Sequence, residues 1–161
     1  MVPVFFLSLA ILLSGCSQQA VPPGFEAGSA AYRRGDYGIA LKAFRPLAEQ
    51  GNAAAQSNLG VMYEKGQGVS QDYKEAARWY RDAADQGNAT AQFNLARLYG
   101  LGQGVPQDYV YSHMWLSLAV ANGNKFAIAG KTRDALEKLM TPSQIEEAQR
   151  RTREWKPKNS K

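Results

Sequence analysis

The chain has 161 residues, of which 45% are hydrophobic, and a formal net charge of +5 at pH 7. This length favours one domain, and the ordinary apolar content excludes a wholly disordered chain. Residues 131–161 hold nine basic and five acidic side chains, so most of the net charge belongs to the C-terminal end. A solvated helix end explains this excess, and contact with an anionic lipid, cell-wall polymer or nucleic acid is the alternative. We expect no nucleic-acid partner, because no nucleic-acid motif accompanies the charge.

Residues 1–15 carry the apolar run of a secretory signal peptide, although no Lys or Arg precedes it. Its roughly ten apolar residues would rise only about 15 Å as a helix, about half of the hydrocarbon core, which argues against a membrane span. The alternative is a buried N-terminal segment. The residues LSGC that end at Cys16 resemble the lipobox of bacterial lipoproteins. The resemblance implies a lipid anchor on Cys16, followed by a short flexible tether that extends to residue 24.

Cys16 is the only cysteine of the sequence, so no internal disulfide is expected. A serine at position 17, where aspartate would retain a lipoprotein at the inner membrane, implies transport to the outer membrane. We therefore expect a bacterial envelope protein that is lipid-anchored at the periplasmic face of the outer membrane.

The rest of the chain is organised by a repeat of 36 residues. GQGVSQDY at 66–73 recurs as GQGVPQDY at 102–109, and AAAQSNLG at 53–60 recurs as ATAQFNLA at 89–96. Apolar residues within each unit follow helical spacing, which predicts four antiparallel helix pairs over residues 25–51, 52–87, 88–123 and 124–156. A disordered basic tail is expected at 157–161. The predicted helices cover residues 25–34, 36–50, 53–65, 72–86, 89–101, 108–122, 125–139 and 142–155.

The repeated glycine-rich phrase is interpreted as a joint between helices. A dinucleotide-binding loop would need glycine at position 105, which is Val105, and a preceding strand, whereas the context is helical. Glycine suits a left-handed residue after a helix, and aspartate suits the start of the next one. The residues assigned to turns and caps are Gly66, Gly68, Asp72, Gly102, Gly104 and Asp108.

Three further helix starts are predicted from the same rules. Asp36 is expected to cap the second helix, and Asp72 with Glu75 resembles a capping box. Thr141 and Gln144 flank Pro142 and predict a capping box at the last helix, where the GQGV phrase is missing. The last pair is therefore expected to be an atypical cap of the array.

Residues 53–109, with Gly60, Tyr63, Trp79 and Tyr80 among the matching positions, resemble tandem Sel1-like repeats, a family of helix hairpins related to tetratricopeptide repeats. The resemblance implies an all-α, right-handed α-solenoid that serves as a protein-binding scaffold. Some cysteine-rich members have been connected with β-lactam binding, but they carry a disulfide in each repeat. That activity is not transferred to this chain.

No constellation of residues predicts catalysis. His113 is the only histidine, which argues against a Ser-His-Asp triad and leaves a zinc site dependent on carboxylates. We expect His113 to be a partly exposed structural residue. The chain is therefore not expected to be an enzyme or to hold a metal or cofactor.

The first helix of each hairpin is expected to line a concave face that binds another envelope protein or peptide, with the chain itself a monomer. Asparagine can donate to and accept from a peptide backbone at once, although two asparagines in equivalent positions could equally tie hairpins together. The alternative function is binding of an envelope glycan or a β-lactam-like ligand, with or without weak hydrolysis. The candidate binding residues are Asn58, Met62, Lys65, Asn94, Arg97 and Leu98.

Overall fold

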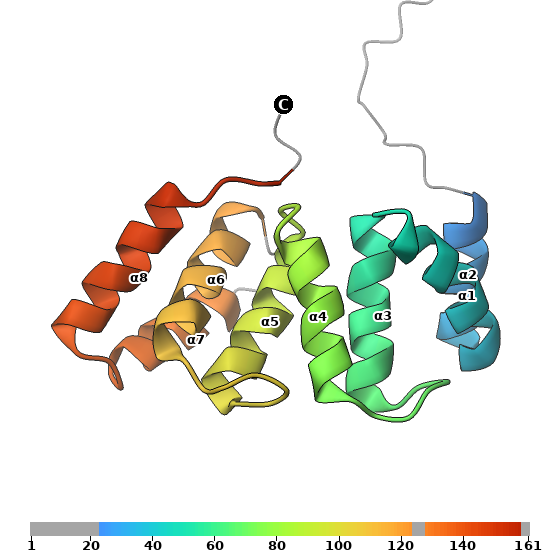
Figure 1. The fold of residues 1–161 in the computed structure, drawn as a ribbon, viewed down its shortest axis with the longest axis horizontal. Coiled ribbons are helices and arrows are strands. Elements are labelled where there is room, and N and C mark those ends of the chain that lie inside the picture. Colours follow the sequence, from blue (N-terminus) through green and yellow to red (C-terminus); the bar gives the residue numbers. More distant parts are fainter. Residues whose placement is uncertain (1–22, 124–127, 159–161) are drawn as a thin grey trace, which may run out of the picture.

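The computed structural model describes residues 23–123 and 128–158, which form eight α-helices and no β-strand. The predicted signal peptide, Cys16 and most of the tether lie outside the described residues. The helices lie within a few residues of their predicted positions (Figure 1). They are α1 (Pro23–Arg34), α2 (Tyr37–Glu49), α3 (Ala53–Lys65), α4 (Tyr73–Ala84), α5 (Ala89–Leu101), α6 (Tyr109–Ala121), α7 (Ile128–Glu137) and α8 (Pro142–Glu154).

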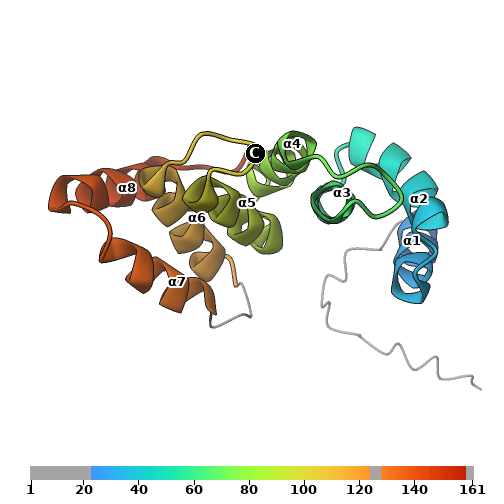
Figure 2. The ribbon, with the colours of Figure 1, turned by 90° about the horizontal axis from the view of Figure 1, so that it is seen from below.

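The first six helices form three hairpins that stack side by side. Within a hairpin α1 packs on α2, α3 on α4 and α5 on α6, and successive hairpins meet where α2 packs on α3 and α4 on α5. Figure 2 shows α1 beside α2 and α3 beside α4, with α6 between α7 and α8. We call the surface formed by α1, α3, α5 and α7 the inner face. The chain is an all-α solenoid, as predicted.

The two copies of the glycine-rich phrase form equivalent joints. Gly66 and Gly102 end α3 and α5 with φ angles of +65° and +67°, a conformation that costs glycine little. The side chains of Asp72 and Asp108 then cap α4 and α6 by accepting hydrogen bonds from backbone N–H groups of the first turn. The phrase thus ends one helix and starts the next within six residues, as its sequence indicates.

The second glycine of each phrase fixes the joint to the preceding hairpin. Gly68 and Gly104 have φ angles of +73° and +69°. A Cβ atom at Gly68 would lie 2.9 Å from the carbonyl oxygen of Tyr37, and one at Gly104 would lie 2.2 Å from that of Tyr73. Each loop therefore packs directly on the start of the preceding hairpin's second helix, where no side chain fits.

Two of the other predicted caps are absent. Asp36 makes no side-chain bond to the start of α2 and instead pairs with Arg34, 3.0 Å away. The carboxylate of Glu75 does not complete a capping box with Asp72, because it accepts hydrogen bonds from Arg78. The capping box of Thr141 and Gln144 is present at α8. The sequence thus indicates where caps are possible. At Asp36 and Glu75 the carboxylate interacts with an arginine instead of the helix start.

A buried glutamine links each hairpin to the one before it. Gln56 donates a hydrogen bond of 3.1 Å to the carbonyl oxygen of Ala48, and Gln92 makes the same bond of 3.1 Å to Ala84. Their side-chain oxygens accept from amide groups 30 residues further on, at Gln86 (2.7 Å) and Asn122 (3.0 Å) respectively. Because the glutamine is buried, these bonds satisfy polar groups that would otherwise be costly to bury.

Small residues let the helices of a hairpin approach closely. Ala55, Ala76 and Ala83 are fully buried, and a Cβ atom at Gly60 would lie 2.5 Å from the ring of Tyr80. The close contact between α3 and α4 leaves room for the large ring only because Gly60 has no side chain. Packing at this density makes the central hairpins rigid supports for the inner face.

The last two helices do not form the hairpin that was predicted for residues 124–156. Both α7 and α8 pack on α6, and they make little contact with each other. Figure 2 shows α7 and α8 on different sides of α6 and diverging from each other. The GQGV joint, which closes the central hairpins, is missing between them. In its place Met140 is buried against α6 and the capping box starts α8.

The end of the chain is not the free tail that was predicted to begin at residue 157. The backbone N–H of Lys158 donates a hydrogen bond of 2.9 Å to the carbonyl oxygen of Asp85, and its ammonium group pairs with the Asp85 carboxylate. The ring of Trp155 packs edge-on against Trp115, with 6.2 Å between centroids. Residues 155–158 therefore bind back on the end of α4. Residues 159–161 lie outside the described part of the chain.

Candidate binding surface

The structure divides the residues that were predicted to bind a partner. Met62 and Leu98 are fully buried in the core, so the prediction that they contribute to a binding surface is wrong. They lie on the apolar stripes of α3 and α5 that form the core. Lys65 is exposed in the last turn of α3.

Asn58 and Asn94 lie on inner-face helices and are half-buried. Neither side chain makes a hydrogen bond within residues 23–123 and 128–158. The links between hairpins are instead made by Gln56 and Gln92. Asn58 and Asn94 therefore do not tie the hairpins together by hydrogen bonds, and their role in binding stays a prediction.

Arg97 belongs to a polar network between neighbouring hairpins. Its guanidinium pairs with the carboxylate of Glu64 on α3, and the hydroxyl of Tyr80 donates a bond of 2.9 Å to the same carboxylate. Burial raises the pKa of Tyr80, and the adjacent Glu64 carboxylate raises it further. The positive charge of Arg97 is therefore balanced by the carboxylate of Glu64. The aliphatic part of the Arg97 side chain remains available to line the inner face.

An apolar groove of about 640 Å³ lies between α5 and α7 on the inner face. We call it the α5–α7 groove. Phe93, Arg97 and Leu101 come from α5, and Leu116 of α6 lies at its base. The opposite wall and the rest of the lining are Ile128, Thr132, Ala135 and Leu136 from α7, with Leu139 after it, and Gly100, Gln107, Tyr109 and Ser112.

Three large apolar side chains of the groove are exposed to solvent. Leu101, Ile128 and Leu139 are 59%, 54% and 67% exposed, and they are three of the five most exposed large apolar residues in the described chain. Single exposed apolar residues are common on proteins, but a cluster of them in one concavity marks an interaction site. The groove can therefore bind an apolar surface.

Sequence reasoning missed this groove although a signal was present. Ile128, Thr132, Ala135 and Leu139 follow one another at helical spacing and form a second stripe beside the buried Ala129 and Leu136. One stripe is enough to pack α7 on α6. A second stripe indicated that this helix presents an additional apolar face.

The described residues that line the groove include no histidine, cysteine, aspartate or glutamate. Within the described residues no group of three or more His, Cys, Asp and Glu side chains could hold a metal ion. His113, expected to be partly exposed, is buried at 2% exposure, and its Nε2 lies 2.7 Å from a carboxylate oxygen of Glu137. The bond joins α6 to α7, which gives the histidine a structural role. No helix among the described residues is long and apolar enough to cross a membrane.

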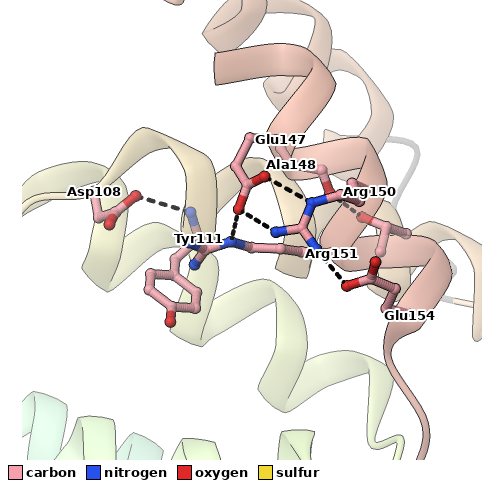
Figure 3. A network of polar contacts seen from close by, with 8 residues as sticks. Asp108, Tyr111, Glu147, Ala148, Arg150, Arg151 and Glu154 are labelled. Carbon is pink, nitrogen blue, oxygen red and sulfur yellow. Dashed lines mark hydrogen bonds and ion pairs between the residues drawn. The ribbon is translucent and has the colours of Figure 1, made fainter. Parts of the chain in front are cut away.

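A second concavity lies on the opposite side, among α4, α6 and α8, and Figure 3 shows its polar network. Aromatic rings and arginines together suit a glycan or an anionic ligand. Here, however, Glu147 accepts bonds of 2.7 Å from Arg150 and 2.6 Å from Arg151, and Arg150 also pairs with Glu154 at 2.6 Å. The guanidinium of Arg151 lies 4.6 Å from the ring centre of Tyr111. These arginines already have partners, so the α5–α7 groove is the stronger candidate site.

The fold and the groove define a class, a solenoid of helical hairpins with an apolar groove on its inner face. The model of the Sel1 repeat matches residues 53–88 and 89–124, which correspond to the hairpins α3–α4 and α5–α6. The chain therefore carries two Sel1 repeats, as the sequence predicted. No curated protein sequence matches the chain significantly.

Solved structures of such proteins are similar to the chain. The crystal structure of c5321, a protective antigen of uropathogenic Escherichia coli that displays an SLR fold, matches 82% of this chain at 33% identity and a TM-score of 0.75. A Sel1 repeat protein from Oxalobacter formigenes matches 82% at 29% identity and a TM-score of 0.66. The chain spans 29% and 56% of those two chains. One has an SLR fold and the other is a Sel1 repeat protein, so the comparisons show the repeat fold.

Proposed function

We propose that this protein is a non-catalytic adaptor of the bacterial envelope that binds another protein or peptide through its inner face, with the α5–α7 groove as the main site. The observation that carries this proposal is the gathering of Leu101, Ile128 and Leu139, all exposed, around one concavity. Burial of such side chains by a partner would supply about 25 cal/mol per Å² of apolar surface. Asn58, Asn94 and Lys65 would add polar contacts beside the groove.

The rigid central hairpins support this function. The Gly104 joint and the Gln92 link hold α5 in place against its neighbours, so one wall of the groove is fixed before a partner arrives. A preformed wall costs less conformational entropy on binding than a mobile one. The adaptor role thus requires no reacting group, only a stable apolar surface.

Recovery of partners from the native host tests the proposal. We expect the protein, purified from cross-linked membranes, to recover a specific partner that is lost in the double variant Leu101→Asp/Leu139→Asp. Both leucines are more than half exposed, so the charges should not prevent folding. Ile39→Asp is the matched control, because Ile39 is 58% exposed on α2, away from the groove. Equal recovery by all three proteins, or recovery of cell-wall fragments alone, would contradict the adaptor function.

We also propose that the adaptor is a monomer anchored by a lipid on Cys16 at the periplasmic face of the outer membrane. The support is the sequence LSGC after an apolar run of signal-peptide length. Stable anchoring needs more than one acyl chain, which the diacylglyceryl group of a lipoprotein supplies. Cys16→Ala should move the protein to the soluble fraction when membranes are sedimented. Unchanged sedimentation with the membrane would refute the anchor.

A further inference from the structure

We propose that the occupant of the α5–α7 groove is an amphipathic helix of the partner, with an apolar face and an acidic edge that lies along α7. This inference rests on the proposed function and names the chemistry of the partner. It follows from two properties of the groove, the shortage of free polar groups in its walls and the position of unpaired cations on its rim.

The walls favour a helix over an extended segment. They are made of helices whose backbone groups are already paired within each helix. Among the polar side chains of the groove, Arg97 is engaged by Glu64, and the amide of Gln107 donates to the carbonyl oxygen of Gly100 at 2.8 Å. An extended peptide would bury backbone N–H and C=O groups against this surface without partners. A helix satisfies those groups internally and presents only side chains.

The rim of the groove favours acidic side chains. Lys131 and Lys138 precede the groove residues Thr132 and Leu139 by one position each. The buried Ala129 lies on the other side of the stripe, so the two lysines flank the groove on its solvent side, two helical turns apart. Both are exposed, and neither takes part in an ion pair in the described structure.

The other charged groups around the groove are already matched. On α5, Arg97 is paired with Glu64. On α7, Asp134 pairs with Arg133 at 2.8 Å, and the carboxylate of Glu137 is held by His113 of α6. The unmatched charge at the groove is therefore positive and belongs to Lys131 and Lys138. Two rim ion pairs of ordinary strength should change the affinity of a ligand by about tenfold.

Synthetic peptides test this inference on the full chain. Three fluorescent 18-residue peptides would share one leucine stripe at helical spacing; the first carries glutamates along one edge, the second carries lysines there, and the third is the first with a central proline. We expect the acidic peptide to bind about tenfold tighter than the basic one by anisotropy, and the proline peptide to lose binding because proline breaks the helix. Leu139→Asp should weaken all binding, whereas Ile39→Asp should not.

Charge reversal sharpens the test. Lys131→Glu/Lys138→Glu should remove or invert the preference for the acidic peptide, and Lys42→Glu/Lys74→Glu, exposed on α2 and α4, should leave it unchanged. Equal or tighter binding of the basic or the proline peptide would overturn the inference. So would self-association of the chain that Leu139→Asp abolishes, because the occupant would then be a second copy. If a partner is still recovered in a manner that depends on Leu101 and Leu139, the adaptor function stands while the acidic helix is refuted.

Discussion

The two central hairpins, α3–α4 and α5–α6, differ from the terminal helices α7 and α8 in how they join to their neighbours. Each central hairpin has a GQGV joint packed on the preceding hairpin and a buried glutamine that bonds to it. The terminal helices lack both devices and pack separately on α6. α3 and α5 make only slight contact with each other, and an apolar groove opens between α5 and α7. The repeat therefore builds a rigid support, and the surface available for binding arises where the repeat ends.

The largest effect is expected at the joint between the second and third hairpins. Gly104→Ala should lower the free energy of unfolding by about 3 kcal/mol, because it adds backbone strain at a φ of +69° to a clash with the Tyr73 backbone. Gly123→Ala is the control, since its φ is +79° but no atom of the described residues lies within 4 Å of the added Cβ. It should cost about 1 kcal/mol. Urea unfolding measures both, and equal losses would show that the joint is not tightly packed.

The buried glutamine link should have the next largest effect. Gln92→Ala removes two hydrogen bonds, one to the carbonyl of Ala84 and one from the amide of Asn122, at a cost of about 2 kcal/mol. The carbonyl of Ala84 keeps its bond from the backbone N–H of Gly87. Gln56→Ala removes the equivalent link at the preceding joint and should cost about the same. Gln149→Ala, exposed on α8, should change the unfolding midpoint little. A large difference in the loss of unfolding free energy between Gln92→Ala and Gln56→Ala would show that the two joints are not equivalent.

Loss of the bond that attaches α7 to α6 should have a smaller effect on stability, and this effect should be confined to α7. Glu137→Ala removes the partner of the buried His113, at a cost of about 1 kcal/mol. Hydrogen exchange should become faster in α7 while the amides of α3 and α4 keep their protection. Faster exchange throughout the chain would mean that the terminal region is not independent of the central hairpins.

The smallest effect concerns acid stability of the last helix. Hydrogen bonds from Arg150, then Arg151, lower the pKa of Glu147 from 4.5 to about 2. A carboxylate with a lowered pKa stabilises the fold above its unfolded pKa, and this contribution is lost as the pH falls through the folded value. The Tm of Glu147→Gln should therefore be slightly below that of the native protein at pH 7, with the gap closing between about pH 4.5 and 2. Glu146→Gln, which removes an exposed carboxylate without an ion pair, should show no such gap.

The regular part of the fold could be predicted from sequence because its signals are local and repeated. Gly66 ends α3, and Asp72 starts α4 six residues later. The same spacing recurs 36 residues further on at Gly102 and Asp108. The inner-face site could be predicted only in part, since burial depends on contacts between hairpins. Met62 and Leu98 share their helices with exposed residues, and only the packed structure shows that both are inside. The groove depends on the separation of α5 from α7, which no local pattern encodes.

We propose that the partner binds where the repeat ends. A photo-cross-linking amino acid at Thr132 of α7, compared with one at Lys74 of α4, tests this directly. Thr132 lines the α5–α7 groove, whereas Lys74 is exposed in the first turn of α4 and is not part of the groove lining. In native cells we expect a discrete protein adduct from Thr132 that Leu101→Asp eliminates, and no adduct from Lys74. Adducts of equal yield from both positions, or a Thr132 adduct that persists in Leu101→Asp, would contradict it.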